Sequence, residues 1–413
     1  MKRRALLGLI AAFALSMAAV NPCYAQKPVT LRLVQWKTEA REAIEDIIAE
    51  FHREYPHITV NMEIPGQYDS YIQAKAAVNE LPDIVGLYGT GLFDYAKSEL
   101  IQELTGAPFL SRCTPFSLRA TTDQNGRVWG LPIDGSAIGV YYNKSIFQKH
   151  NLEVPRTMAE LEKVCTVLKK NNITPFALAY KDAWTIKMAA ITCYDNYVYG
   201  PHPDWTEQRN RGQVTFAGSS EWKQVLDALR FILNNGNTNT AFETDYDTAA
   251  VMLATGKSAM LVQGLWALVG IRSIDPDMDL GMFAMPAFWP GAKLVHFTDL
   301  CLCMSANTKH PSEARLFLDF LTQPQAALAW CRGAQLFSAV KGVKPDFDPI
   351  TGDIFAYIDR GDTTTVHDRI WWSSFNTTFE KVIQEWMVGS TTDAEALKKL
   401  DDLWDKAKAS GNR

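Results

Sequence analysis

The chain has no excess of positive charge, so it lacks the broad basic surface that nucleic-acid binding requires. Its 413 residues carry 41 Lys and Arg against 46 Asp and Glu, a formal net charge of -5. Beyond residue 20 it also has no apolar run of the roughly 18 residues that a transmembrane helix needs. We therefore expect neither a nucleic-acid partner nor a membrane-spanning body.

Sequence motifs of catalysis, nucleotide binding and metal binding are absent as well. No G-x-S-x-G, H-E-x-x-H, Walker or G-x-G-x-x-G motif occurs, and the seven histidines lack the spacing of metal ligands. No pair of carboxylates is marked by its spacing as a glycosidase pair. We predict no catalytic residue, no cofactor and no metal site, although missing motifs do not by themselves exclude an enzyme.

Cysteine is scarce, with seven in the whole chain. Cys301 and Cys303 alternate on a predicted strand, so their side chains point to the same side and are poorly placed to bond each other. A disulfide between one of them and Cys331 remains open, as does the alternative of buried free thiols. A metal site built on this C-x-C is the weakest interpretation because matching ligands are missing.

The first 25 residues have the three parts of a secretory signal peptide. A positive segment at 2–4 precedes an apolar run at 5–20, and Cys23 and Ala25 place small residues where a signal peptidase reads them. We predict cleavage after Ala25 and export to the periplasm. The mature net charge would be -8, since the leader carries three cations and the full chain has -5. An N-terminal membrane anchor is the alternative.

The mature chain begins with alternating strand and helix patterns. Residues 29–36, 58–64 and 82–89 read as strands, and helical periodicity fills 43–51 and 71–78. This alternation predicts parallel pairing with right-handed crossovers in an open α/β sheet. Ligands bind beyond the carboxyl ends of such strands. The candidate residues there are Trp36, Glu39, Gln67, Tyr88 and Thr90.

A chain of this length favours two domains, and one segment has the features of a crossing between them. Residues 130–147 read as an extended segment that three glycines loosen. Beyond it, helical patterns return at 157–170, 221–234 and 393–407.

The stretch MLATGKSAMLVQGLW, residues 252–266, points to a binding residue. A helix ends at Gly256, residues 258–262 read as a short buried strand, and Gly264 lets the chain turn closely. Trp266 follows at the carboxyl end of this strand and opens a helix. We interpret it as a platform for a sugar ring, since the chain is rich in aromatics, with 12 Trp, 14 Tyr and 20 Phe. A tryptophan that only packs the helix is the alternative.

These features together resemble family 1 extracellular solute-binding proteins, the sugar-type, maltose-binding-protein-like receptors of ABC importers. The resemblance rests on GKSAM at 256–260 followed by GLW at 264–266, on GLPIDGSAIGVYYNKSIF at 130–147, on PDIVGLYG at 82–89, and on 300–328. It spans essentially the whole mature chain, and the order of these motifs makes it specific.

The resemblance implies an α/β fold of two lobes, each an open, mostly parallel sheet flanked by helices, with the ligand cleft between them. Lobe one would span 26–136 and 296–342, and lobe two 137–295 and 343–413. A carbohydrate that touches both lobes would shift the population toward a closed form. The closed form, a monomer, would then dock on a membrane permease.

The resemblance also implies roles for individual residues. Trp266 would stack on the sugar. The other residues implied to contact the ligand are Trp36, Glu39, Tyr88, Thr90, Asp134, Ser136, Trp184, Asp299 and Trp372.

Two other functions remain open. A secreted carbohydrate-active enzyme would share the export signal and the aromatics but would turn its substrate over. A receptor of the same fold could instead bind glycerol phosphate, a polyamine or iron; phosphate favours arginines, and a polyamine favours clustered acids. The candidate residues include carboxylates and aromatics but no arginine, which favours a neutral sugar or polyol.

Overall fold

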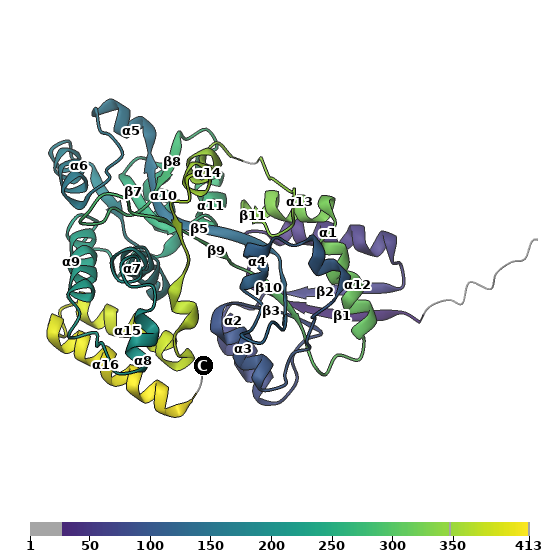
Figure 1. Cartoon of the computed structure of the whole chain (residues 1–413). Helices are drawn as coiled ribbons and strands as arrows, with labels where there is room; N and C mark the ends of the chain where they lie inside the picture. Colours follow the sequence, from purple (N-terminus) through teal and green to yellow (C-terminus); the bar gives the residue numbers. More distant parts are fainter. Residues whose placement is uncertain (1–26, 347, 412–413) are drawn as a thin grey trace, which may run out of the picture.

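A computed structural model describes residues 27–346 and 348–411, so the expected signal peptide lies outside the described residues. The described chain forms two α/β halves with one sheet each, which we call lobe one and lobe two (Figure 1). The strand order is β2-β1-β3-β10-β4 in lobe one and β12-β9-β5-β7-β6 in lobe two, where β8 and β11 also pair with β5.

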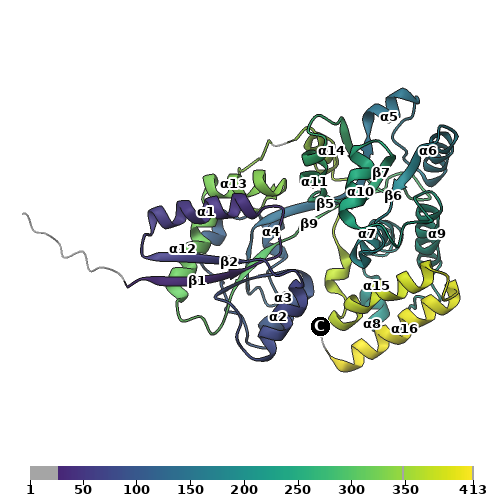
Figure 2. The same ribbon diagram turned by 180° about the vertical axis from the view of Figure 1, so that it is seen from behind.

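Lobe one confirms the parallel α/β start that the sequence predicts. Its strands are β1 (Val29–Val34), β2 (Ile58–Glu63), β3 (Ile84–Leu87), β4 (Leu131–Pro132) and β10 (Cys301–Met304). β1 pairs parallel with β2 and β3, while β10 returns antiparallel beside β3. Its helices are α1 (Arg41–Glu54), α2 (Tyr68–Ala77), α3 (Gly89–Lys97), η1 (Pro108–Arg112), α4 (Pro115–Arg119), α12 (Pro311–Leu321) and α13 (Pro324–Ala334). Both views place α2 and α3 on the side that faces lobe two (Figures 1 and 2).

Lobe two is built around β5 (Asp134–Asn143), which is buried along its whole length. The other strands are β6 (Thr174–Ala177), β7 (Ser258–Gly264), β8 (Leu280–Phe283), β9 (Leu294–Thr298), β11 (Phe337–Ser338) and β12 (Thr363–Thr364). The helices are α5 (Lys144–Lys149), α6 (Met158–Lys170), α7 (Ala183–Tyr197), α8 (Trp205–Asn210), α9 (Ser220–Asn234), α10 (Tyr246–Ala254), α11 (Ala267–Ile274), α14 (Ile350–Arg360), η2 (His367–Ile370), α15 (Ser373–Met387) and α16 (Asp393–Ser410).

In lobe two, as in lobe one, a single strand runs against the direction of the others, and here that strand is β5. β5 pairs antiparallel with β7, β8, β9 and β11, and only β6 with β7 and β12 with β9 are parallel. The reason is that β5 enters from lobe one as a crossing strand. Its direction is therefore not set by the strand–helix–strand repeat that makes neighbouring strands parallel.

Two crossings between the lobes lie side by side. One passes from β4 into β5 at Asp134, and the other passes from β9 into β10 at Asp299. The Asp299 N–H donates to the Asp134 carbonyl at 3.0 Å, and the Ile133 N–H donates to the Leu300 carbonyl at 3.0 Å. These bonds join the crossings into one short hinge, as the extended 130–147 segment suggests.

The cysteines decide between the alternatives left open by the sequence. All six in the described chain are free and buried, Cys301, Cys303 and Cys331 among them. The interpretation as buried free thiols is confirmed, and the disulfide with Cys331 is not formed. In the described part of the chain, no helix has both the length and the apolarity to cross a membrane.

The last helix begins with a reciprocal cap that offers a test of the local structure. The Thr392 hydroxyl accepts a hydrogen bond from the Glu395 N–H, and the Glu395 carboxylate accepts one from the Thr392 N–H. We expect Thr392→Ala to lower the free energy of unfolding by about 1 kcal/mol, since it leaves a helix donor unsatisfied. Urea denaturation measures this loss; an unchanged midpoint would contradict the capping role.

Candidate functional site

A cavity of about 430 Å³ lies between the two lobes. Lobe one lines it from α2, the end of β3 and α3, and lobe two lines it from α7, residues 366–369 and α15. Its volume falls within the roughly 300–1,000 Å³ of small-molecule sites. The aromatic side chains that line it are Tyr68, Tyr88, Tyr95, Trp266 and Phe297.

Trp266 is positioned by the strand before it. β7 is buried along its whole length, and Trp266 is the N-cap residue of α11. A Cβ atom at Gly264 would lie 2.1 Å from the Trp266 indole, so only glycine leaves room for the ring at the strand end. Phe297 meets the indole edge-on, with ring centroids 6.4 Å apart. These contacts hold the half-buried ring at the cavity wall.

We expect Gly264→Ala to displace the Trp266 ring and weaken ligand binding by at least about tenfold, a loss of about 1.4 kcal/mol. A matched control is Gly270→Ala in α11, where an added Cβ meets nothing within 4 Å. Isothermal titration with the ligand measures both variants. Equal affinities for Gly264→Ala, Gly270→Ala and the wild type would contradict this role of Gly264.

A buried lysine lies at the hinge beside the cavity. Lys37 comes shortly after β1 in the chain. Its ammonium nitrogen lies 2.6 Å from a carboxylate oxygen of Asp299. It also lies 3.8 Å from a carboxylate oxygen of Asp134 and 3.9 Å from a carboxylate oxygen of Glu39. Lys37 and Asp134 are fully buried, whereas Asp299 also lines the cavity. The indole N–H of Trp330 donates to Asp134 at 2.9 Å. One cation therefore joins lobe one to both crossings.

The charges of this cluster depend on one another. Burial raises the pKa of Asp134 to about 6, although Lys37 opposes the shift. Burial alone would lower the pKa of Lys37, but Asp134, Asp299 and Glu39 outweigh it and raise that pKa above its ordinary value. Burial also raises the pKa of Glu39. Lys37 thus stays charged, and its charge is what permits carboxylates in this buried place.

Lobe two presents a second polar group from α7, η2 and α15. The Lys187 ammonium contacts Asp368 at 2.8 Å and donates to the Asn376 side-chain oxygen at 2.6 Å, and Glu380 lies 3.9 Å away. All four side chains line the cavity. Burial raises the pKa of Glu380, although Lys187 opposes the shift. This arrangement offers several carboxylate and amide acceptors to hydroxyl donors of a ligand.

Directly behind η2, Asp195 is fully buried and pairs with His367, whose Nδ1 lies 3.0 Å from a carboxylate oxygen. Burial raises the pKa of Asp195 to about 7, although the His367 hydrogen bond opposes the shift. A carboxyl group whose pKa is higher in the folded state binds more protons there than when unfolded. Its contribution to stability is therefore present at low pH and is lost as pH rises from about 4 to about 7.

We expect Asp195→Asn to flatten this part of the stability profile. In the wild type, the free energy of unfolding should fall by on the order of 1–3 kcal/mol between about pH 5 and pH 7.5 from this group. Urea denaturation at several pH values measures the slope for both proteins. Identical slopes would show that Asp195 does not titrate in this range.

Comparison with known proteins identifies the family. The family described as bacterial extracellular solute-binding protein matches residues 46–353, about three quarters of the chain. The chain belongs to this family. The resemblance inferred from the sequence motifs is thereby confirmed.

The relatives of this solute-binding protein support the same fold over nearly its whole length. The multiple sugar-binding protein of Streptococcus mutans is 28% identical, with 84% of each chain covered. The melibiose/raffinose/stachyose-binding protein MelE of Bacillus subtilis is 24% identical, covering 78% of this chain and 76% of MelE. The structure of RafE in complex with raffinose has a TM-score of 0.81 at 23% identity, covering 92% of this chain and 99% of RafE. The apo form of RafE from Streptococcus pneumoniae has a TM-score of 0.74 at 22% identity, covering 92% and 98%.

In this solute-binding protein the cavity brings together three of the expected residues, Tyr88, Trp266 and Asp299. Tyr88 is 44% exposed, and its hydroxyl donates to Asp69 at 3.2 Å. Trp36 meets Tyr88 edge-on at 5.2 Å and supports it from lobe one. Glu39 belongs to the Lys37 cluster.

Four other expected residues do not line the cavity. Asp134 and Ser136 are fully buried in the hinge strand and do not line the cavity. Gln67 is exposed just before α2. Trp184 is 37% exposed, and its ring centroid lies 6.5 Å from that of Trp266. The side chain of Thr90 lies outside the described residues.

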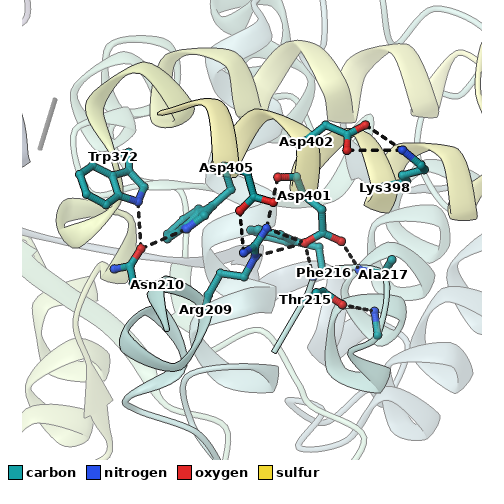
Figure 3. Close-up of polar contacts among 12 residues, drawn as sticks. Arg209, Asn210, Thr215, Phe216, Ala217, Trp372, Lys398, Asp401, Asp402 and Asp405 are labelled. Atoms are coloured by element: carbon teal, nitrogen blue, oxygen red, sulfur yellow. Dashed lines mark hydrogen bonds and ion pairs between the residues drawn. The ribbon is translucent and has the colours of Figure 1, made fainter. Parts of the chain in front are cut away.

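Trp372 does not reach the cavity in the described structure, because it serves the packing of lobe two. Its indole N–H donates to the Asn210 side-chain oxygen at 2.9 Å (Figure 3). The same oxygen also accepts a hydrogen bond from the Trp404 indole N–H at 3.1 Å. In the same region, Asp401 of α16 accepts hydrogen bonds from the backbone of Phe216 and Ala217 (Figure 3). These contacts tie α8 and the loop after it to α15 and α16.

Several cavity residues are missed by the sequence reasoning. They are Asp69, Tyr95, Lys187, Asp368, Arg369 and Glu380. Asp69 and Tyr95 lie close in sequence to the predicted strand ends at Gln67 and Tyr88, so a wider window after each strand would have included them. Lys187, on a nearly buried helix, carries no such signal.

Among the described residues, no group of three or more His, Cys, Asp or Glu side chains is placed to hold a metal ion.

Proposed function

We propose that this protein is the substrate-binding component of an ABC-type importer and that its ligand is a neutral sugar or polyol. The observation that carries the proposal is the cavity between the lobes, which the Trp266 indole lines together with hydrogen-bonding side chains such as Tyr88 and Asp299. An aromatic face suits the C–H face of a sugar, and carboxylates suit its hydroxyls. The named relatives bind sugars, which supports the same class of ligand here.

Lobe closure is the proposed mechanism. A ligand that contacts α2 and α3 of lobe one together with α7 and η2 of lobe two favours the closed form over the open form. Closed protein would then deliver the ligand to the membrane permease. We also propose export with cleavage after Ala25, a monomeric receptor, and lobes that divide near residues 136, 296 and 342, with β5, β9 and β11 completing the sheet of lobe two.

The charge of the cavity argues against an anionic ligand such as glycerol phosphate. Lysine and arginine contribute two cations, Lys187 and Arg369, and the acidic lining is Asp69, Asp94, Asp299, Asp368 and Glu380. This acidic excess makes a polyamine the second candidate. Because aromatic rings cover both sides of the cavity, the sugar remains the better match.

A thermal-shift screen tests the proposal, since a ligand that binds only the folded state raises the melting temperature. We expect a stabilising hit among neutral mono- and oligosaccharides, followed by titration without turnover of the sugar. Stabilisation by spermidine alone would favour the second candidate. Product formation from a glycan would support a carbohydrate-active enzyme instead.

A further inference from the structure

A second cavity of about 580 Å³ lies beside the first. Lobe one lines it with α3 and with the loop at 122–129, and lobe two lines it with Arg369 and Ile370. Ile370 is 48% exposed and offers apolar surface to this cavity. Because both lobes contribute, this cavity depends on the same arrangement of the lobes as the first.

Arg369 lines both cavities and marks where they meet. Its guanidinium lies over the Phe297 ring, 4.9 Å from the centroid. One of its terminal nitrogens, Nη1, is buried and has no hydrogen-bond partner among the described residues. A buried donor without an acceptor costs about 1–3 kcal/mol. Because Nη1 is buried, a ligand would meet the rest of the Arg369 side chain, which lines both cavities.

The loop at 122–129 is held in a fixed conformation. The Asp123 carboxylate accepts hydrogen bonds from the backbone N–H groups of Asn125 and Arg127, from Arg127 Nε and from the Trp129 indole N–H. Arg127 also lies over the Trp129 ring, 4.9 Å from its centroid. Burial is not what holds this loop, since Gln124 and Asn125 are exposed. The cavity therefore has a preformed polar wall with two amide side chains.

The chemistry of this cavity fits an uncharged, polyhydroxylated chain. Gln124 and Asn125 offer both donors and acceptors, while Phe93, Trp129 and Ile370 offer apolar surface. Its charged residues are of both signs, so the cavity as a whole does not select for a charged group. The basic residues that line it are Lys97, Arg127 and Arg369, and the acidic residues are Glu99 and Asp123.

We infer that the ligand is an oligosaccharide whose rings fill the first cavity and extend past Arg369 into the second. This inference rests on the proposed function and names the length class of the sugar. One part of the chain would stack on Trp266. A later unit would pass the Arg369 side chain, which lines both cavities, and would contact Gln124 and Asn125. A monosaccharide would leave the second cavity without a ligand.

Titration calorimetry with sugars of increasing length tests the inference. Suitable series are galactose, melibiose, raffinose and stachyose, and the malto-, cello- and xylo-oligosaccharides. In whichever series binds, we expect the Kd to fall by at least about tenfold from disaccharide to tetrasaccharide. A Kd that stays constant beyond the disaccharide would overturn the inference and leave the proposed function intact. Failure of every saccharide to bind would overturn both.

Three variants locate the added affinity. Gln124→Trp fills the second cavity from an exposed position, so we expect it to remove the gain for the tetrasaccharide while disaccharide affinity stays within about twofold. Gln148→Trp makes the same change at an exposed position on α5, which lines neither cavity, and should keep the gain. An undiminished gain in Gln124→Trp, and in a second cavity-filling variant, Asn125→Trp, would overturn the inference.

Discussion

Trp266→Ala is expected to lower the affinity for the sugar by about 30- to 100-fold, or about 2–3 kcal/mol. The indole is a half-buried ring on the cavity wall, set there by Gly264 and braced by Phe297. Removing it deletes the stacking surface and the apolar area that the sugar covers. Titration calorimetry with the best sugar from the screen measures the loss.

The control for this prediction is Trp266→Phe, which keeps a flat ring and should retain part of the affinity. Circular dichroism and the melting temperature without ligand show whether each variant is folded. If a folded Trp266→Ala variant binds the sugar as tightly as the wild type, the indole is a packing residue and not the platform.

Lys37→Met is expected to lower the free energy of unfolding by about 3–5 kcal/mol, because it leaves buried carboxylates without their cation. Asp134 is fully buried, and the Lys37 ammonium is its ion-pair partner. The same change removes the ion pair that holds the Asp299 side chain at the cavity, so the affinity for the ligand should fall too. Urea denaturation without ligand measures the stability separately from binding.

A matched control is Lys181→Met, whose ion pair with Asp245 is largely exposed. Pairs of that kind contribute about 0–1 kcal/mol, so this variant should be nearly as stable as the wild type. The double variant Lys37→Met/Asp134→Asn removes the unpaired charge of the fully buried Asp134 and should recover part of the loss. Equal stability of Lys37→Met and Lys181→Met would show that the buried cluster does not hold the hinge.

Much of lobe one, together with β7 and Trp266 of lobe two, could be predicted because the signals are local. Strand alternation, helical periodicity and the glycines at 256 and 264 each act within a few residues, and β1, β2, β3 and β7 appear where these patterns place them. Gly256 has a φ of +71°, as expected of a residue just beyond a helix. Trp266 follows from the same local pattern.

The rest depends on residues that meet only in the folded chain. Lys37 and Asp299 are 262 positions apart, and nothing near either residue in the sequence announces their ion pair. Lys187 meets Asn376 across 189 positions. Likewise, β5 runs against the other strands of lobe two because it is a crossing strand, and its direction is a property of the whole topology. Trp372 illustrates the opposite error, since an aromatic placed by family resemblance proves to be a packing residue.

A crystal structure of the protein with the sugar that gives the largest thermal shift tests the central claim most directly. The account predicts one sugar ring with its face against the Trp266 indole, hydrogen bonds to Asp299 or Tyr88, and contacts to both lobes. A sugar bound elsewhere on the surface, or one held by a single lobe with Trp266 untouched, would contradict it.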